Sequence, residues 1–460
     1  MSGRYEPRHY QIDMHGNGCE FLVSLDHGIS APPMVRFLDL PVGRLLSRLA
    51  SPIAADIFDI GLAVQTADKL CPRGKRTKHQ SYGYWARRID VKLAVRFPEI
   101  WCQSSNRARL EELLNFLTDD DWNFDFVRRP DGGRPQESSV QQSLLPVGLP
   151  QHPAVTLFSG GIDSTYGLHL LRRSSHDVIF PLTVTNNGRI AGLRDRVLNA
   201  LMTNRQSDLA IKPMTTWMQV SRRDGSVPNG VKLEDSARGR AVQFIFAGAA
   251  LAINCGCNVL YVSENGYGAI GLPLTSDHFG SRATKAMHPK TLAMAADLIS
   301  MVSGRTFTVQ NLGFGRTKGE MIKELAADPL GRIALNQTAT CDRRKHRGLR
   351  KGCGVCTSCL LRYAGFKATT IVDPIEYVVP PSLDLNGPYS GGVALGYQTW
   401  VLQEVLRSQR PMEALVEEFP EVRSVQQFLP APDSLLPMLH RHTLEVSTLT
   451  SASSQFSDAA

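Results

Sequence analysis

The stretch that decides the fold is Leu157-Phe158-Ser159-Gly160-Gly161-Ile162-Asp163-Ser164-Thr165. It lies where a short apolar run, 154–158, gives way to a helical pattern, so a buried strand should turn into a helix here. Ligands of open α/β sheets bind beyond the carboxyl ends of the strands, which is the position of this turn. Adjacent glycines let the backbone approach an anion, and the first N–H groups of a helix attract it. The stretch predicts either a phosphate loop or a tight, capped turn without a ligand.

The polar side chains of this stretch suit a polyphosphate. Ser159, Ser164 and Thr165 would add hydroxyl donors around one anion. Asp163 would either cap the helix or hold Mg²⁺ against the phosphates. The stretch lacks the lysine of the kinase-like phosphate loop, so a different way of binding the nucleotide is expected.

Downstream of this turn, apolar runs alternate with helical patterns. Strands are expected at 154–158, 178–184, 214–220, 259–262 and 306–312, and the helices that follow them at Asp163, Ile190, Ser236, His288 and Lys318. Such alternation is typical of parallel βαβ units. It predicts an α/β fold with a doubly wound parallel sheet and helices on both faces.

The rest of the chain is expected to flank this nucleotide-binding unit. Residues 1–128 mix helical and strand patterns, including a helix at 52–70 and a strand at 89–95, and should form an α+β accessory domain. The predicted divisions are an accessory domain at 1–128, a linker at 129–151, the nucleotide domain at 152–370, an extension at 371–446 and a disordered tail at 447–460. Three adjacent carboxylates, 119–121, favour a solvated turn over a metal site.

Composition limits the classes of function. The chain has 460 residues, with 51 Lys and Arg against 43 Asp and Glu, a net charge of +8. This mild excess permits a nucleic-acid partner without requiring one. The N-terminal residues do not resemble a signal peptide, so a cytoplasmic protein is expected. The uncharged stretch 241–263 is interrupted by Gln243, Asn254 and Asn258, which favours a buried helix and strand over a membrane span.

Four of the nine cysteines form a metal-ligand pattern. Cys341 is followed by Cys353, Cys356 and Cys359, and Cys-x-x-Cys turns bring two thiolates to one ion. This spacing predicts a structural zinc knuckle, with an iron–sulfur cluster or a redox dithiol as alternatives. The ten residues 342–351 between the first two cysteines carry six basic side chains, which indicates either a contact with RNA or an acidic protein, or a solvated loop.

The Ser159–Ser164 loop resembles the S-G-G-x-D-S motif of the PP-loop ATP pyrophosphatases. Together with the zinc motif and Thr317-Lys318 before a helix, residues 154–367 look like the 7-cyano-7-deazaguanine synthase (QueC-like) family. The resemblance implies ATP, Mg²⁺ and Zn²⁺ as cofactors and cleavage of ATP to AMP and pyrophosphate. It also implies activation of the carboxylate of 7-carboxy-7-deazaguanine, transfer to ammonia, and a second activation that dehydrates the amide to a nitrile.

Carried over to this chain, the resemblance gives each motif a role. The loop residues Ser159, Gly160, Gly161, Asp163, Ser164 and Thr165 would bind pyrophosphate, and Cys341, Cys353, Cys356 and Cys359 would hold zinc. Lys318 would neutralise phosphate charge. Arg240 falls where the family has an arginine before its fourth helix, although Arg238 could substitute for it or both could be surface charges.

The departures from the family are informative. An Asp- and Pro-rich substrate loop is replaced here by 263–278, which implies a changed or enlarged substrate. The added N- and C-terminal regions look like the longer synthase-like proteins of bacterial anti-phage operons, such as the C subunits of Qat systems. That likeness implies protein partners from the same operon, one of which could supply the amine.

Two other functions stay open at this point. One is a tRNA-modifying PP-loop enzyme of the thiolase kind, with Cys255 or Cys257 as the sulfur carrier. The other is an assembly subunit that has kept the fold and lost turnover.

Overall fold

The computed structural model describes residues 8–17, 20–25, 34–38, 51–73, 86–130, 151–185, 188–202, 209–221, 233–234, 238–274, 285–341, 351–384, 391–429 and 434–449. Most of the predicted linker, the basic loop at 342–350, residues 275–278 of the altered substrate loop and the tail from 450 lie outside these ranges. Among the described helices, none combines the length and the apolar character needed to cross a bilayer.

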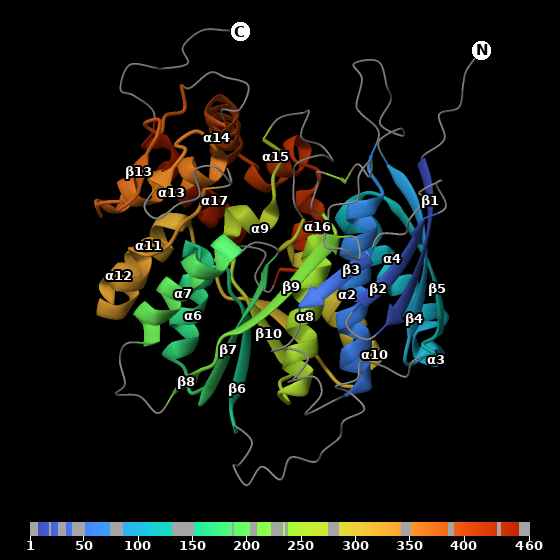
Figure 1. Cartoon of the computed structure of the whole chain (residues 1–460). Helices are drawn as coiled ribbons and strands as arrows, with labels where there is room; N and C mark the ends of the chain where they lie inside the picture. Colours follow the sequence, from blue (N-terminus) through green and yellow to red (C-terminus); the bar gives the residue numbers. More distant parts are fainter. Residues whose placement is uncertain are drawn as a thin grey trace, which may run out of the picture.

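One eleven-stranded sheet runs through the molecule (Figure 1), in the order β11-β10-β6-β7-β9-β3-β2-β1-β4-β5, with β8 paired to β7. The strands that this sheet takes from the chain after residue 150 are β6 (Pro153–Leu157), β7 (Val178–Thr185), β8 (Ala210–Ile211), β9 (Met214–Ser221), β10 (Val259–Val262) and β11 (Thr308–Asn311). All of their pairings with one another are parallel. The α/β fold and its parallel sheet, predicted from the alternating pattern, are confirmed.

Helices cover both faces of this part of the sheet. The helices are α6 (Ile162–Arg172), α7 (Gly188–Met202), α8 (Arg240–Asn254), α10 (Pro289–Ser303), α11 (Lys318–Ala327) and α12 (Pro329–Leu335). Ala154 and Ile179 pack with α6 and α7 in one apolar cluster. Val155 and Phe180, their neighbours along the strands, belong to a separate cluster with α8 and α10. Because side chains alternate along a strand, the two clusters lie on opposite faces, as a doubly wound sheet requires.

The N-terminal region, residues 1–128, extends the same sheet. Its elements are β1 (Arg8–Asn17), β2 (Glu20–Leu25), β3 (Met34–Leu38), α2 (Pro52–Leu70), β4 (Arg87–Val95), α3 (Pro98–Trp101), α4 (Ser104–Thr118) and β5 (Asp121–Arg128). Strand β3 pairs antiparallel with β9, so Met34 lies opposite Ser221. Helix α2 lies beside α8 (Figure 1) and shares its buried cluster. The division of the chain into domains at 129–151 stays a prediction.

The solvated turn expected at 119–121 is wrong for its middle residue. Asp120 is only 4% exposed, and its carboxylate accepts hydrogen bonds from the Arg87 guanidinium at 2.5 and 3.1 Å and from Arg73. Two arginines that lie far away in sequence neutralise it, which no local pattern reveals.

Asp119 likewise has distant partners. It adopts a left-handed conformation, with φ of 57°. Its carboxylate pairs with Arg238 and Lys285, each at 2.6 Å. Since both cations come from the part of the chain after residue 150, this residue ties the N-terminal region to the α/β unit that carries the glycine-rich loop.

The C-terminal elements gather at one end of the molecule (Figure 1). They are β12 (Lys351–Gly352), α13 (Thr357–Thr369), β13 (Glu376–Tyr377), α14 (Gly392–Arg407), α15 (Pro411–Glu418), α16 (Val422–Gln426) and α17 (Leu435–Ser447). Apolar residues of α14 to α17 bury Ile270 and Leu272, which follow β10 in the chain. The extension therefore packs on α9 (Gly266–Ile270), the short helix inside the altered substrate loop.

Candidate active site

The glycine-rich loop joins β6 to α6 at the carboxyl edge of the sheet, as its sequence predicts. Its hydroxyls order the turn: Ser164 Oγ accepts from the Ser159 N–H at 3.2 Å and donates to the Gly161 carbonyl at 3.1 Å. Gly161 is the N-cap residue of α6, and no side chain caps the helix. Because the first N–H groups of α6 have no side-chain cap, they suit an anion.

Gly160 has a backbone that favours glycine. Its φ is +78°, in the left-handed region, where an L side chain costs about 1–2 kcal/mol. A Cβ atom at this position would lie 3.1 Å from Cα of Arg194 in α7. The loop thus packs closely on the next helix.

A pocket of about 300 Å³ opens beyond the loop, at the carboxyl ends of β6, β7 and β10. Its lining includes the loop residues Ser159, Gly161 and Ser164 together with Arg240 and Glu264. The structure therefore brings part of the predicted phosphate loop to the same pocket as the predicted arginine.

The other predicted residues lie around this pocket without lining it. Thr165 is fully buried, with its N–H bonded to the Gly161 carbonyl at 3.0 Å. Lys318, the first residue of α11, directs its ammonium to the carboxylate of Asp163. The second oxygen of Asp163 accepts from the backbone N–H of Asn265 at 3.2 Å and from its side-chain amide at 3.0 Å.

Glu264 joins this group, although no sequence motif assigns it a role. The side-chain amide of Asn265 donates to Glu264 at 2.7 Å as well as to Asp163, so one amide links the two carboxylates. The signal in the sequence was the position itself, directly after the strand β10, where parallel sheets place functional side chains.

The pKa values of Asp163 and Glu264 move in opposite directions because the two carboxyl groups lie close together. Burial raises the pKa of Asp163, but the charge of Lys318, followed by hydrogen bonds from Lys318 and Asn265, outweighs it and leaves this pKa below its ordinary value. Burial and the negative charge of Asp163 raise the pKa of Glu264 to about 8, and Lys318 only partly opposes them. Asp163 is therefore the charged partner of Lys318, and Glu264 carries a proton at neutral pH.

Arg240 begins α8 and is exposed at the pocket. Its guanidinium lies over the ring of Phe244, 5.4 Å from the centroid, and both residues line the pocket. Arg238, the alternative arginine, is instead 4% exposed and paired with Asp119.

The C-terminal extension holds the loop that carries Glu264. The hydroxyl of Tyr267 in α9 donates to Gln398 of α14 at 2.5 Å, and Gln398 donates to the carbonyl of Pro273 at 2.7 Å. The ring of His442 in α17 stacks on Tyr267 with 3.8 Å between centroids. Helices α14 and α17 of the extension thus hold the altered substrate loop through contacts with Tyr267 and Pro273.

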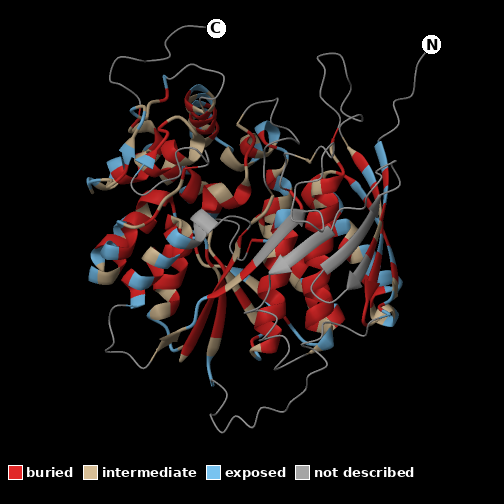
Figure 2. Cartoon of the chain, viewed as in Figure 1, coloured by how far each residue is buried: buried red, intermediate tan, exposed pale blue. Residues whose placement is uncertain are grey.

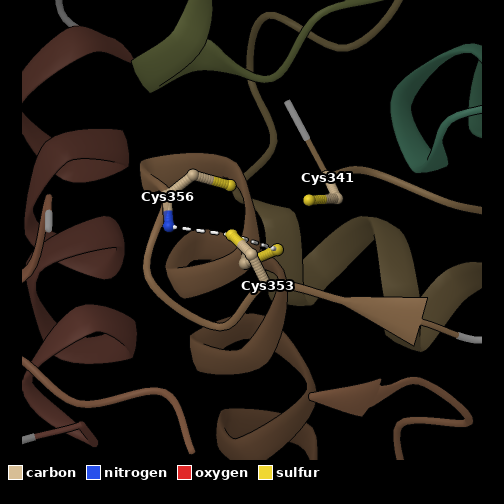
Figure 3. Close-up of side chains that lie close together, drawn as sticks. Cys341, Cys353 and Cys356 are labelled. Carbon is tan, nitrogen blue, oxygen red and sulfur yellow. Dashed lines mark hydrogen bonds between the residues drawn. The ribbon is translucent and has the colours of Figure 1, made fainter. Parts of the chain in front are cut away.

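The four predicted zinc ligands converge. The sulfur atoms of Cys341, Cys353, Cys356 and Cys359 lie within 4.8 Å of one another, and Figure 3 shows three of these side chains turned toward a common centre. The Sγ atoms of Cys353 and Cys359 are 3.9 Å apart. Four thiolates at about 2.3 Å from a tetrahedral ion would be about 3.8 Å apart, so the cluster fits zinc. Because protein atoms would fill all four positions, the ion would stabilise structure.

The two candidate sulfur carriers lie at the opposite edge of the sheet. Cys255 ends α8, a helix of 15 residues that is about 20 Å long, whereas Arg240 at its start lines the pocket. Cys257 contacts the carbonyl of Pro153, at the amino end of β6. Burial raises the pKa of Cys255 to about 12 and that of Cys257 to about 11, so both stay protonated thiols. Neither is placed to carry sulfur to this pocket.

Comparisons with known proteins agree with this geometry. Residues 153–370 match the family model described as "Queuosine biosynthesis protein QueC". A 7-cyano-7-deazaguanine synthase of Desulfitobacterium hafniense is 25% identical over 240 residues, which cover 49% of this chain and 93% of that protein. One from Aromatoleum aromaticum is 28% identical over 236 residues, or 49% and 97%. One from Acetivibrio thermocellus is 42% identical over 79 residues, or 17% and 32%.

This part of the chain is QueC-like. The matched segment holds the glycine-rich loop, Arg240, Glu264, Lys318 and the cysteine cluster. The comparisons therefore support an enzyme of the PP-loop class, and the N-terminal region and the C-terminal extension at 371–446 lie outside the family match.

Proposed function

We propose that the protein uses ATP to activate the carboxylate of 7-carboxy-7-deazaguanine, or of a related acyl compound, and transfers the acyl group to ammonia or to an amine of a protein. The observation that carries this proposal is the Ser159–Ser164 loop, which opens at the end of β6 into a pocket that Arg240 and Glu264 also line. ATP use is expected of a QueC-like domain.

ATP would bind with its polyphosphate at the glycine-rich loop, and the acid would bind so that its carboxylate faces the α-phosphorus. The polyphosphate would lie at the N-terminus of α6, where the N–H groups of the loop and the hydroxyls of Ser159 and Ser164 can donate to it. Mg²⁺ would accompany the phosphates. A substrate carboxylate oxygen would attack the α-phosphorus, the bond to the β-phosphate oxygen would break, and pyrophosphate would leave an acyl-adenylate.

Glu264 supplies the group that the second step needs. When an amine attacks the acyl carbon and AMP leaves, the attacking nitrogen must lose a proton. Glu264 lines the pocket, and with a pKa of about 8 only a minor fraction of it is deprotonated at neutral pH; this carboxylate form would accept the proton, and the fraction grows as the pH rises toward 8. Lys318 would keep Asp163 charged and so maintain that raised pKa.

The added regions suit a larger acceptor. The extension holds the substrate loop through Tyr267 and Gln398, and the N-terminal region packs on α8. On the likeness to the longer synthase-like proteins, we propose that the chain is a C subunit of a Qat-type anti-phage system and acts in the cytoplasm. Its acceptor would then be an amine on a protein of the same operon. The six basic residues of the segment 342–351 would suit a contact with nucleic acid.

The test is nucleotide cleavage by the purified full-length chain. With 7-carboxy-7-deazaguanine and ammonium, ATP labelled at the α-phosphate should yield AMP, with an equal amount of pyrophosphate. Ser164→Ala should slow this release, because it removes a loop hydroxyl that lines the pocket. Release of ADP and phosphate, or no dependence on the acid, would contradict the proposal.

The acceptor needs a separate measurement. When a protein is the acceptor, mass spectrometry of the proteins that co-purify with the chain should show one of them heavier by the acyl group of the deazaguanine acid, attached to an amine. Free amide or nitrile as the only product would assign ammonia instead.

A further inference from the structure

The N-terminal region contributes a side chain to the candidate pocket. Gln65 of α2 lines it together with residues of the nucleotide-binding unit. It is 3% exposed, in a helix whose residues are almost all buried, as Figure 2 shows. The family match begins only at residue 153, so this residue is an addition to the QueC-like domain.

Two contacts fix how α2 approaches α8. A Cβ atom on Gly61 would lie 2.9 Å from Cβ of Phe246 and 3.3 Å from Cα of Gln243, so the two backbones nearly touch there. Two turns further on, Asp68 accepts from the N–H of Gly239 at 3.0 Å. The helices are therefore antiparallel.

Gln65 lies between these contacts. It follows Gly61 by four residues and so shares its face of α2. That face meets the first turn of α8, where Arg240, Gln243 and Phe244 also line the pocket. The side chain is thus directed to the part of the pocket next to Arg240.

The amide oxygen of Gln65 is an unused acceptor. It is shielded from solvent and accepts no hydrogen bond from any of the described residues. Leaving a buried acceptor without a donor costs about 1–3 kcal/mol, and such groups in native proteins usually meet a partner from water or a ligand. The side-chain amide of Gln65 can therefore form a hydrogen bond with a polar group of whatever fills the pocket that this residue lines.

We infer that the side-chain amide of Gln65 hydrogen-bonds the polar edge of the acyl substrate, so that the N-terminal region helps to select a planar, nitrogen-containing heterocyclic acid. This inference rests on the proposed function. The phosphates belong at α6, whereas α2 and α8 cover the opposite face of the sheet. On that side the cation of Arg240 suits the carboxylate of the acid, the ring of Phe244 suits its heterocycle, and the Gln65 amide suits the polar edge of that heterocycle.

The experiment is calorimetric titration of the full-length chain with two separate probes. They are 7-carboxy-7-deazaguanine and the α,β-methylene analogue of ATP, which cannot release pyrophosphate. Gln65→Met keeps the side-chain volume and removes the amide, and Gln65→Ala is a second variant in case the first misfolds. Thr66→Val is the matched control, because its hydroxyl donates to the carbonyl of Leu62 within the helix and does not line the pocket.

We expect both Gln65 variants to bind the acid about tenfold more weakly and the ATP analogue within about twofold of wild type. Thr66→Val should bind both probes as wild type does. Unchanged affinity for the acid, or a loss confined to the ATP analogue, would overturn the inference and leave the proposed function standing. Wild-type protein that binds the analogue but not the acid would overturn both.

Discussion

The carboxylate of Asp68 in α2 accepts a hydrogen bond from the backbone N–H of Gly239, 3.0 Å away and one residue before α8 begins. The other oxygen of Asp68 pairs with Arg87 at 2.7 Å, inside the N-terminal region. One buried residue thus joins the charge cluster of the N-terminal region to the start of the helix that carries Arg240. The geometry of the pocket wall depends on how these two helices meet.

Asp68→Ala should therefore destabilise the whole protein. The substitution leaves Arg87, which is 1% exposed, without one of its two carboxylate partners, and it also removes the acceptor for Gly239. Breaking a buried pair costs about 3–5 kcal/mol. Denaturant unfolding should show a loss of this size. Glu413→Ala, which breaks an exposed pair with Arg410, should change stability by less than about 1 kcal/mol. Similar losses in the two variants would contradict the coupling.

Gly160→Ala should abolish most nucleotide cleavage. The new Cβ atom strains a backbone with φ of +78° and approaches Cα of Arg194 at 3.1 Å, so the loop must shift away from the anion. We expect pyrophosphate release to fall at least about tenfold. Gly304→Ala is the control, because φ is +67° there and nothing lies within 4 Å of the added atom. If both variants keep wild-type rates, the loop does not hold the polyphosphate.

Removing one zinc ligand should remove both the metal and stability. Cys353 is 2% exposed at the centre of the cysteine cluster, and the other three sulfurs cannot complete a tetrahedron without it. Metal analysis should find a single zinc in wild type and little in Cys353→Ser, whose melting temperature should drop by about 10 °C. Cys102→Ser, at an exposed cysteine outside the cluster, should keep both. Iron in place of zinc would favour the iron–sulfur alternative.

Stability should fall in acid partly because of His288. Its Nδ1 accepts from the Lys290 N–H at 3.1 Å at the start of α10, and its ring meets Phe116 of α4. Burial, followed by repulsion from Lys285 and Lys290, lowers the pKa of His288 to about 4, from an ordinary value of 6.5. The folded state thus binds fewer protons than the unfolded state between these values, so this contribution is complete above pH 6.5 and is lost as the pH falls toward 4.

His288→Asn keeps an oxygen that can cap α10 and does not titrate, so its melting temperature should fall less than that of wild type between pH 6.5 and 4. Expressed as free energy of unfolding, the loss between pH 6.5 and 4 should be smaller in the variant by about 3 kcal/mol, since each pKa unit corresponds to about 1.4 kcal/mol. His440→Asn, at an exposed position of α17, should follow the wild-type curve. If the melting temperatures of wild type and His288→Asn fall in parallel with pH, His288 does not cause this part of the acid instability.

Local patterns were enough to predict the nucleotide-binding fold. The strands at β6, β7, β9, β10 and β11 lie within two residues of the expected ranges, because buried parallel strands leave continuous apolar runs. The loop and the cysteine cluster were also visible, since their residues are close in sequence. The spacing of Cys353, Cys356 and Cys359 alone brings three sulfurs together.

Contacts between distant segments could not be predicted in this way. Lys318 is 155 residues from Asp163, and Asn265 is 102 residues from it, so the charge arrangement that shifts the pKa of Glu264 exists only in the folded chain. Gln65 reaches the pocket only because α2 packs on α8. The strands β1 to β3, which extend the sheet through β9, were missed, although Tyr10, Ile12 and Met14 of β1 alternate with polar residues as a half-buried strand requires.

Glu264→Gln should separate the two steps of the proposed reaction. The amide keeps the size of the side chain and can still contact Asn265, but it accepts no proton from the incoming amine. Acid-dependent exchange of labelled pyrophosphate into ATP should stay within about threefold of wild type, because formation of the acyl-adenylate moves no proton through this group. Amide formation should fall by about 100-fold or more, the usual contribution of a positioned base. Equal losses in exchange and in amide formation would show instead that Glu264 acts in adenylation or in binding, because a residue needed only for the second step leaves the first intact.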